Sequence, residues 1–148
     1  MFLRLVGPVT QEDYREEIEK RARELGVSGR LELTGALKSG SKELVAAYHA
    51  ADVFVLASRH EPFGIAVLEA WAAGVPVVAS DVGGLGKLLA AHPGAAVPFP
   101  PGDANRLDGA IAEALANAEA LRSAGLEAAR LYDWKTLSSR LVEFYGEV

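Results

Sequence analysis

The chain has 148 residues and a formal net charge of −5, and half of its residues are hydrophobic. This length fits one domain with one large core, and the composition is that of a globular rather than a disordered protein. The negative charge argues against a nucleic-acid or membrane-surface binder, but a small phosphate ligand is compatible with it because helix N-termini bind anions without basic residues. Without cysteine, the chain has no disulfide framework, no thiol nucleophile and no cysteine-bound metal.

The sequence also argues against a metal site and a membrane span. His49, His60 and His92 show no metal-binding spacing, and no apolar run is long enough to cross a bilayer. Residues 1–4 are too short for a signal peptide and lead directly into a strand pattern. We therefore expect a cytoplasmic protein that needs no metal and no cofactor.

The first part of the chain alternates between strand and helix patterns. Residues 3–7 are predicted to form a strand, and a capping-box pattern at Thr10 predicts a helix that ends near Gly26. A second strand is predicted at 31–33 and a second helix at 42–51.

The alternation continues through the middle of the chain. Residues 53–57 form a continuous apolar run, as expected of a central parallel strand that is covered on both faces. A helix at 63–73, a strand at 75–79, a short helix at 85–91 and a strand at 95–97 follow.

The last third of the chain is predicted to be helical. Asp103 caps a long helix, the chain stays helical after Gly125, and Asp133 caps a final helix. Strands separated by helices imply right-handed crossovers and parallel pairing. We predict an α/β fold, a Rossmann-like doubly wound parallel sheet that forms a single domain over residues 1–148. Ligands of such folds lie at the carboxyl ends of the strands.

One carboxylate stands out in the helix that follows the central strand. Glu69 is the only polar side chain between Gly64 and Gly74, and the helix is otherwise apolar all round, which predicts a buried helix. A buried carboxylate is costly unless it is paired. Its partner is either a cation, such as Arg59 or Lys87, or a ligand that donates hydrogen bonds, such as a ribose diol. The residue pattern taken alone favours the ion pair.

The start of the same helix has no adjacent Ser, Thr, Asp or Asn cap at Phe63 and Gly64. Pro62 has no N–H of its own, and the backbone N–H groups after it lack helical acceptors. A phosphate or sugar oxygen can accept from them, and Gly64 lets a ligand approach the backbone closely. The alternative is that the side chain of Glu61 caps the helix, and the sequence does not separate the two.

Two glycine-containing segments have features of phosphate-binding loops. Residues 80–84 follow a strand and open a helix, which indicates either a backbone cradle for phosphate or a turn that needs a positive φ. Residues 35–42 imitate a Walker A loop, but Ser41 separates Gly40 from Lys42, and we reject this interpretation. The chain has no G-x-G-x-x-G, which argues against a standard dinucleotide site.

These residues resemble the carboxyl-terminal domain of the retaining GT-B glycosyltransferases of group 1, which include glycogen-synthase-like and sucrose-phosphate-synthase-like enzymes. The central feature is an E-x7-E motif that begins with Glu61-Pro62-Phe63-Gly64 and ends with Glu69-Ala70. The resemblance covers essentially the whole chain. Its other segments are 30–35, 50–53, 74–80, 83–84 and 133–134.

The resemblance implies a nucleoside diphosphate sugar as substrate. By analogy, Glu61 contacts the donor sugar and is the catalytic residue, and Glu69 binds the ribose. Transfer of a hexose proceeds with retention at the anomeric carbon and without metal. The donor-binding residues implied in this way are Phe63, Gly64, Ile65, Glu69, Gly35, Gly83 and Gly84.

Two departures from the family pattern affect the expected activity. The family carries an Arg and a Lys upstream of the first strand, and an amino-terminal acceptor domain, neither of which is in this sequence. Lys87 also stands where an acidic residue is usual. We therefore expect sugar-nucleotide binding without transfer by the chain alone, and an acceptor domain in cis or in trans as partner.

Two other functions were considered. The chain is alternatively a non-catalytic nucleotide-sugar-binding subunit or interaction module that pairs with a separate chain. A flavodoxin-like or response-regulator-like regulatory domain is disfavoured, because it needs an acidic cluster at the end of the first strand and residues 7–9 carry none.

Overall fold

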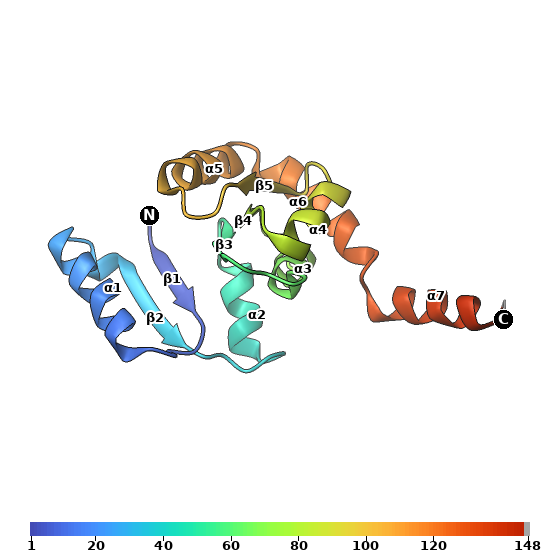
Figure 1. Cartoon of the computed structure of the whole chain (residues 1–148), viewed down its shortest axis with the longest axis horizontal. Coiled ribbons are helices and arrows are strands. Elements are labelled where there is room, and N and C mark those ends of the chain that lie inside the picture. The colour runs from blue at the N-terminus through green and yellow to red at the C-terminus, as the bar shows by residue number, and fades with distance from the viewer. Residues whose placement is uncertain (147–148) are drawn as a thin grey trace. The chain divides into compact units, whose positions relative to one another are not determined.

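The computed structural model describes residues 1–146. Its internal contacts divide the chain into two compact units, Met1–Val45 and the part that begins at Ala46. Both units contain helices and parallel strands (Figure 1). The fold class, α/β with parallel strands, is confirmed. The five strands pair in two separate sheets, of two and three strands, where one continuous sheet was expected.

The amino-terminal unit is built around one parallel strand pair. Leu3 lies opposite Leu31 and Leu5 opposite Leu33, and the Thr34 hydroxyl donates to the Leu5 carbonyl oxygen at 3.2 Å. The elements of this unit are β1 (Leu3–Val6), α1 (Glu12–Glu24), the 3-10 helix η1 (Ser28–Arg30), β2 (Leu31–Gly35) and the start of α2 (Lys42–His49).

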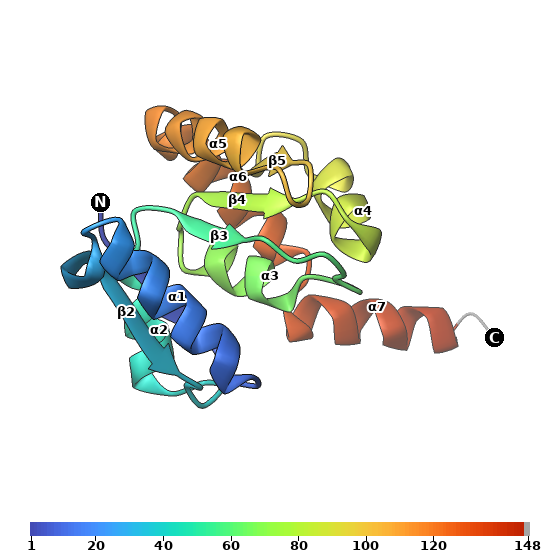
Figure 2. The same ribbon diagram turned by 60° about the vertical axis from the view of Figure 1, so that its left-hand side comes forward.

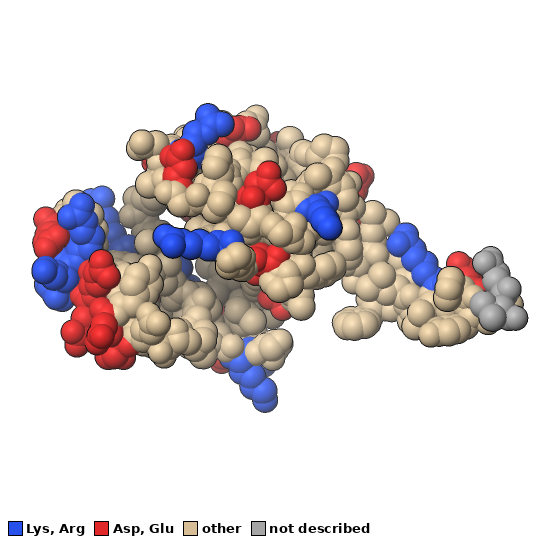
Figure 3. Space-filling model, viewed as in Figure 1, with Lys and Arg blue, Asp and Glu red and all other residues tan. Residues whose placement is uncertain are grey.

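Helix α1 differs from the sequence prediction at its start. Its N-cap residue is Gln11, and no side chain accepts a hydrogen bond there, so the capping box predicted at Thr10 is wrong. The exposed face of α1 instead carries ion pairs one turn apart, with Arg15 donating to Glu19 at 3.1 Å. Figure 3 shows the basic and acidic side chains of this unit next to one another. Such exposed pairs contribute little to stability.

The second unit is built on a three-stranded parallel sheet in the order β3–β4–β5. Val78 of the central strand lies opposite Val55 on one side and Val97 on the other. All four residues of β4 are buried, as expected of a parallel strand with both faces covered. The strands are β3 (Phe54–Leu56), β4 (Val77–Ser80) and β5 (Ala96–Phe99).

Helices cover both faces of this sheet, with α3 on one side and α5 on the other (Figure 2). The side chains of β4 alternate accordingly: Val77 and Ala79 belong to the core cluster around α3 and α4, and Val78 to the cluster around α5. The helices are α3 (Ile65–Ala72), α4 (Gly83–Ala91), α5 (Ala104–Ala116), α6 (Ala118–Arg130) and α7 (Trp134–Gly146).

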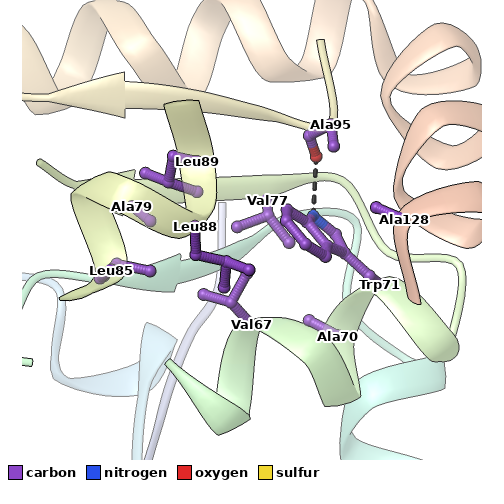
Figure 4. Close-up of a cluster of buried hydrophobic side chains, with 10 residues drawn as sticks. All are labelled: Val67, Ala70, Trp71, Val77, Ala79, Leu85, Leu88, Leu89, Ala95 and Ala128. Atoms are coloured by element: carbon purple, nitrogen blue, oxygen red, sulfur yellow. Dashed lines mark hydrogen bonds between the residues drawn. The ribbon is translucent and has the colours of Figure 1, made fainter. Parts of the chain in front are cut away.

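Trp71 of α3 is the largest fully buried side chain of this unit (Figure 4). Its indole Nε1 donates to the Ala95 carbonyl oxygen at 2.8 Å, which satisfies both buried polar groups. The ring also packs edge-to-face on His92, with centroids 5.7 Å apart. Trp71 therefore ties α3 to the segment that leads into β5.

The predicted caps of the two later helices are confirmed. The Asp103 carboxylate accepts from the Arg106 amide at 3.0 Å at the start of α5, and the Asp133 carboxylate accepts from the Lys135 amide at 2.6 Å at the start of α7. Each cap satisfies one of the orphan amides of the first helical turn.

Candidate functional site

The candidate site lies at the carboxyl edge of the three-stranded sheet, where the loops after β3 and β4 meet. The buried Ser80 hydroxyl donates to the Ser58 carbonyl oxygen at 2.6 Å, which joins the end of β4 to the loop after β3. The Glu61 carbonyl oxygen accepts from the Gly84 amide at 3.1 Å and from the Leu85 amide at 3.4 Å. The starts of α3 and α4 are thus held together by backbone hydrogen bonds.

This close approach of the two loops depends on glycine. A Cβ atom on Gly84 would overlap the carbonyl oxygen of Pro62. Gly83 has a φ of 51°, so the predicted turn with positive φ is present, and the Gly84 amide already donates to protein. That Gly83 and Gly84 bind a donor stays a prediction. Lys87, one turn further along α4, is exposed.

Glu61 lies in the loop before helix α3 and accepts hydrogen bonds from two amides of that loop. Its Oε1 accepts from the Gly64 amide at 3.0 Å and from the Phe63 amide at 3.3 Å. These two amides precede the first residue of α3, and within the helix no side chain accepts a capping hydrogen bond, so the predicted cap by Glu61 is not met there. Gly64 is the N-cap residue, with a left-handed φ of 94° that a side chain would strain.

The next two amides of α3 have no such partner. Within residues 1–146, the N–H groups of Ile65 and Ala66 donate to no protein acceptor. Ile65 is 65% exposed and Ala66 is half-buried, whereas Val67 is buried. Orphan amides at a helix N-terminus attract anions, because the helix dipole adds to their own partial charge.

Glu69 lies in the second turn of the same helix and is half-buried. Its Oε2 accepts a hydrogen bond of 2.8 Å from the hydroxyl of Tyr48 in α2. The ion pair predicted with Arg59 or Lys87 is wrong, since Glu69 forms no ion pair among residues 46–146. The physical reason is that α3 is not buried all round, so the carboxylate keeps part of its hydration and needs only a neutral donor.

The pKa of the Tyr48 phenol is raised by its buried position and by Glu69. Burial raises its pKa well above the ordinary value of 10.0, and the hydrogen bond to Glu69 and the negative charge of Glu69 raise the pKa further. The phenol therefore stays protonated and remains the donor to the carboxylate. The sequence does not single out Tyr48, because a tyrosine on an amphipathic helix is usually a packing residue and no spacing links position 48 to position 69.

A second aromatic residue supports the loop after β3. The Phe63 ring packs edge-to-face on Tyr132, with centroids 6.0 Å apart, and the Tyr132 hydroxyl lies 2.9 Å from His92 Nε2. Tyr132 lies two residues after the end of α6, and the sequence does not single it out either, although it directly precedes the Asp133-Trp134 segment.

Gly35 belongs to the amino-terminal unit, at the end of β2. Its carbonyl oxygen accepts from the Gly7 amide at 3.0 Å. That Gly35 binds the donor stays a prediction, as does the single domain over residues 1–148.

Two general features of the described chain also bear on function. Residues 1–146 contain no group of three His, Asp or Glu side chains that would hold a metal ion. No helix over the same residues combines the length and apolar character that a membrane span requires.

The model of the glycosyl transferases group 1 family matches residues 1–131. The chain therefore belongs to the group 1 glycosyltransferases. A glycogen synthase from Mycobacterium tuberculosis (strain CDC 1551 / Oshkosh) is 35% identical over 150 residues, which cover 97% of this chain and 34% of the relative. A D-inositol 3-phosphate glycosyltransferase from Corynebacterium urealyticum is 32% identical over 131 residues, 86% of this chain and 30% of the relative. The chain thus spans about a third of the length of these relatives.

Solved structures agree with this membership. A sucrose-phosphate synthase from Thermosynechococcus elongatus superposes with a TM-score of 0.79 at 33% identity, over 98% of this chain and 38% of the other. The Anabaena protein HepE in complex with UDP-glucose gives a TM-score of 0.78 at 25% identity, over 99% of this chain and 41% of the other. The fold is that of one half of a GT-B enzyme.

Proposed function

We propose that this chain is the donor-binding part of a retaining glycosyltransferase that uses a nucleoside diphosphate sugar. One observation carries the proposal: Glu61 lies in the loop before helix α3, Glu69 lies on the helix, and the unpaired amides of Ile65 and Ala66 lie between them in the sequence. The proposed ligand contains a sugar, a diphosphate and a ribose in that order. Glu61, the two free amides and Glu69 follow one another in the matching order along the chain.

Each group has a role in this proposal. Glu69 accepts from the ribose hydroxyls with the oxygen that Tyr48 leaves free, and Glu61 accepts from a sugar hydroxyl. The amides of Ile65 and Ala66 donate to the diphosphate, whose charge grows as its bond to the anomeric carbon breaks. The amides of Phe63 and Gly64 already donate to Glu61, so a ligand reaches them only by displacing that carboxylate.

Ligand-dependent thermal stability tests the proposal. UDP, GDP and ADP, each alone and with a sugar attached, are added to the purified chain, with UDP-glucose first because HepE binds it. A ligand at a hundred times its Kd stabilises the folded state by about 2.7 kcal/mol and raises the Tm. Glu69→Ala is expected to abolish the shift, and Glu127→Ala, an exposed acidic residue of α6, to leave it intact. An unchanged shift in Glu69→Ala contradicts the ribose assignment.

Transfer activity requires more than this chain in our proposal. The acceptor-binding domain is supplied in cis or in trans, and the 148-residue chain alone is expected to show no turnover with any acceptor. Turnover by the purified chain contradicts this part of the proposal. If the chain is instead a non-catalytic subunit, a separate companion chain co-purifies with it and the assembled pair shows sugar-nucleotide binding without transfer.

A further inference from the structure

We propose that Tyr48 is a positioning residue, which orients the Glu69 carboxylate so that one oxygen faces the ribose of the nucleotide. The inference rests on the proposed function, since it concerns the same ribose subsite. Its basis is the hydrogen bond of 2.8 Å between the Tyr48 hydroxyl and Glu69 Oε2, which connects α2 to α3 within the second unit.

The Tyr48 ring is held in place independently of Glu69. It packs against Phe54 of β3, with ring centroids 5.5 Å apart at an interplanar angle of 48°, and against the core cluster that contains Trp71. A tyrosine has only two side-chain torsions before the hydroxyl, so ring packing fixes where its hydroxyl lies. The longer side chain of Glu69 has no comparable constraint of its own and loses rotamer freedom when it binds.

One oxygen of the Glu69 carboxylate remains available to a ligand when Tyr48 donates to the other. A phenol has one hydrogen to donate, and it is directed at Oε2, so Oε1 keeps its lone pairs for a ligand. No Lys, Arg or His among residues 46–146 forms an ion pair with Glu69, and its negative charge is therefore not neutralised. Two neighbouring ribose hydroxyls are donors that such an oriented, charged oxygen accepts strongly.

The test compares two nucleotides and two proteins by isothermal titration calorimetry. UDP carries both ribose hydroxyls, and 2′,3′-dideoxy-UDP carries neither. Tyr48→Phe keeps the ring and its packing but removes the hydroxyl. We expect it to weaken UDP binding about tenfold, as loss of one charge-assisted hydrogen bond would, and to leave the affinity for 2′,3′-dideoxy-UDP unchanged. Tyr14→Phe, at an exposed tyrosine of α1, serves as the control and changes neither affinity.

The outcomes separate this inference from the proposed function. Equal weakening of both nucleotides by Tyr48→Phe overturns the positioning role, because a structural defect acts regardless of the hydroxyls. An unchanged affinity for UDP in Tyr48→Phe overturns it too. If the wild-type chain binds both nucleotides equally or binds neither, the ribose assignment itself fails, whatever Tyr48 does.

A double-mutant cycle keeps the test valid if Tyr48→Phe is less stable. Glu69→Gln removes the charged acceptor, and the effect of Tyr48→Phe on UDP affinity is then measured in that background. We expect a much smaller weakening there, because the neutral amide of Gln keeps an oxygen but not the charge that strengthens its hydrogen bond to Tyr48. A full tenfold effect in the Glu69→Gln background overturns the proposal.

Discussion

The backbone carbonyl oxygen of Glu61 lies 3.1 Å from the amide nitrogen of Gly84 and accepts its hydrogen bond. The first turn of α4 has amides that no helical residue satisfies, and the loop before α3 supplies an acceptor for one of them. Two loops that follow different strands thus become one hydrogen-bonded structure. The same residue supplies the carboxylate that accepts from the Phe63 and Gly64 amides before α3, so the placement of both helices and the candidate site depend on the same few atoms.

Replacement of Gly84 by alanine tests this packing. The new Cβ would overlap the Pro62 carbonyl oxygen, so one loop must shift and its hydrogen bonds must lengthen. We expect Gly84→Ala to lower the free energy of unfolding by about 1–3 kcal/mol, the usual cost of overpacking. Urea denaturation followed by circular dichroism measures the loss.

A second glycine provides the matched control. Gly109 lies within α5, and a Cβ there meets open space. Gly109→Ala is expected to raise the free energy of unfolding by about 0.5–1 kcal/mol, because alanine loses less backbone entropy in a helix. If the two substitutions destabilise the protein alike, the overlap at Gly84 does not decide the effect.

The hydrogen bonds of the Glu61 carboxylate hold the loop before α3. Glu61→Ala removes the acceptor of the Phe63 and Gly64 amides and should lower the free energy of unfolding by about 1 kcal/mol, the usual contribution of such hydrogen bonds. Glu61→Gln keeps a side-chain oxygen and should retain most of the stability. Both variants are measured without ligand, so that sugar binding does not contribute. Equal losses in the two variants would show that the amides before α3 do not depend on this side chain.

The sequence predicted the framework of the fold because its signals are local. Residues 53–57 form a continuous apolar run, and the structure has β3 at Phe54–Leu56, paired with a fully buried β4. The aspartates at 103 and 133 cap the helices that follow them, since a cap needs only the next three residues. The division of the strands into two sheets depends instead on which strands pair over long distances, and no local pattern encodes it.

The candidate site was predictable as a set of residues but not as a set of contacts. Glu61 and Glu69 are conspicuous in the sequence because they begin and end a largely apolar segment. The partner of Glu69 was not predictable, because Tyr48 is 21 residues away and lies on a different helix. The expected ion pair assumed a buried charge, whereas partial exposure of the carboxylate removes the need for a cation.

The hydrogen bond between Tyr48 and Glu69 also predicts how stability depends on pH. In the unfolded chain Tyr48 titrates near its ordinary pKa of 10.0, and in the folded protein its pKa is higher, chiefly because of burial. Above that ordinary pKa the unfolded state therefore holds fewer protons than the folded state, and the free energy of unfolding falls as the pH rises. The contribution of Tyr48 is complete below the unfolded pKa and is lost as the pH rises toward the folded pKa.

Tyr48→Phe isolates this contribution. We expect the difference in free energy of unfolding between wild type and Tyr48→Phe to be constant from about pH 8 to about pH 9.5 and to change above that, as wild type alone loses stability through this group. Urea titrations across this range measure it. Parallel curves for the two proteins above the ordinary tyrosine pKa would contradict the raised pKa of Tyr48.

The last prediction concerns Trp71, whose indole N–H donates to the Ala95 carbonyl oxygen at 2.8 Å inside the core (Figure 4). Trp71→Phe removes this buried hydrogen bond and opens a space beside Ala128 of α6. Loss of the hydrogen bond costs about 0.5–1.5 kcal/mol, and the lost packing adds to it. Trp134→Phe, at an 85% exposed tryptophan in α7, makes the same chemical change without burial and should alter stability by less than about 0.5 kcal/mol. Because only the site differs between the two variants, similar losses in urea denaturation would contradict the core role assigned to Trp71.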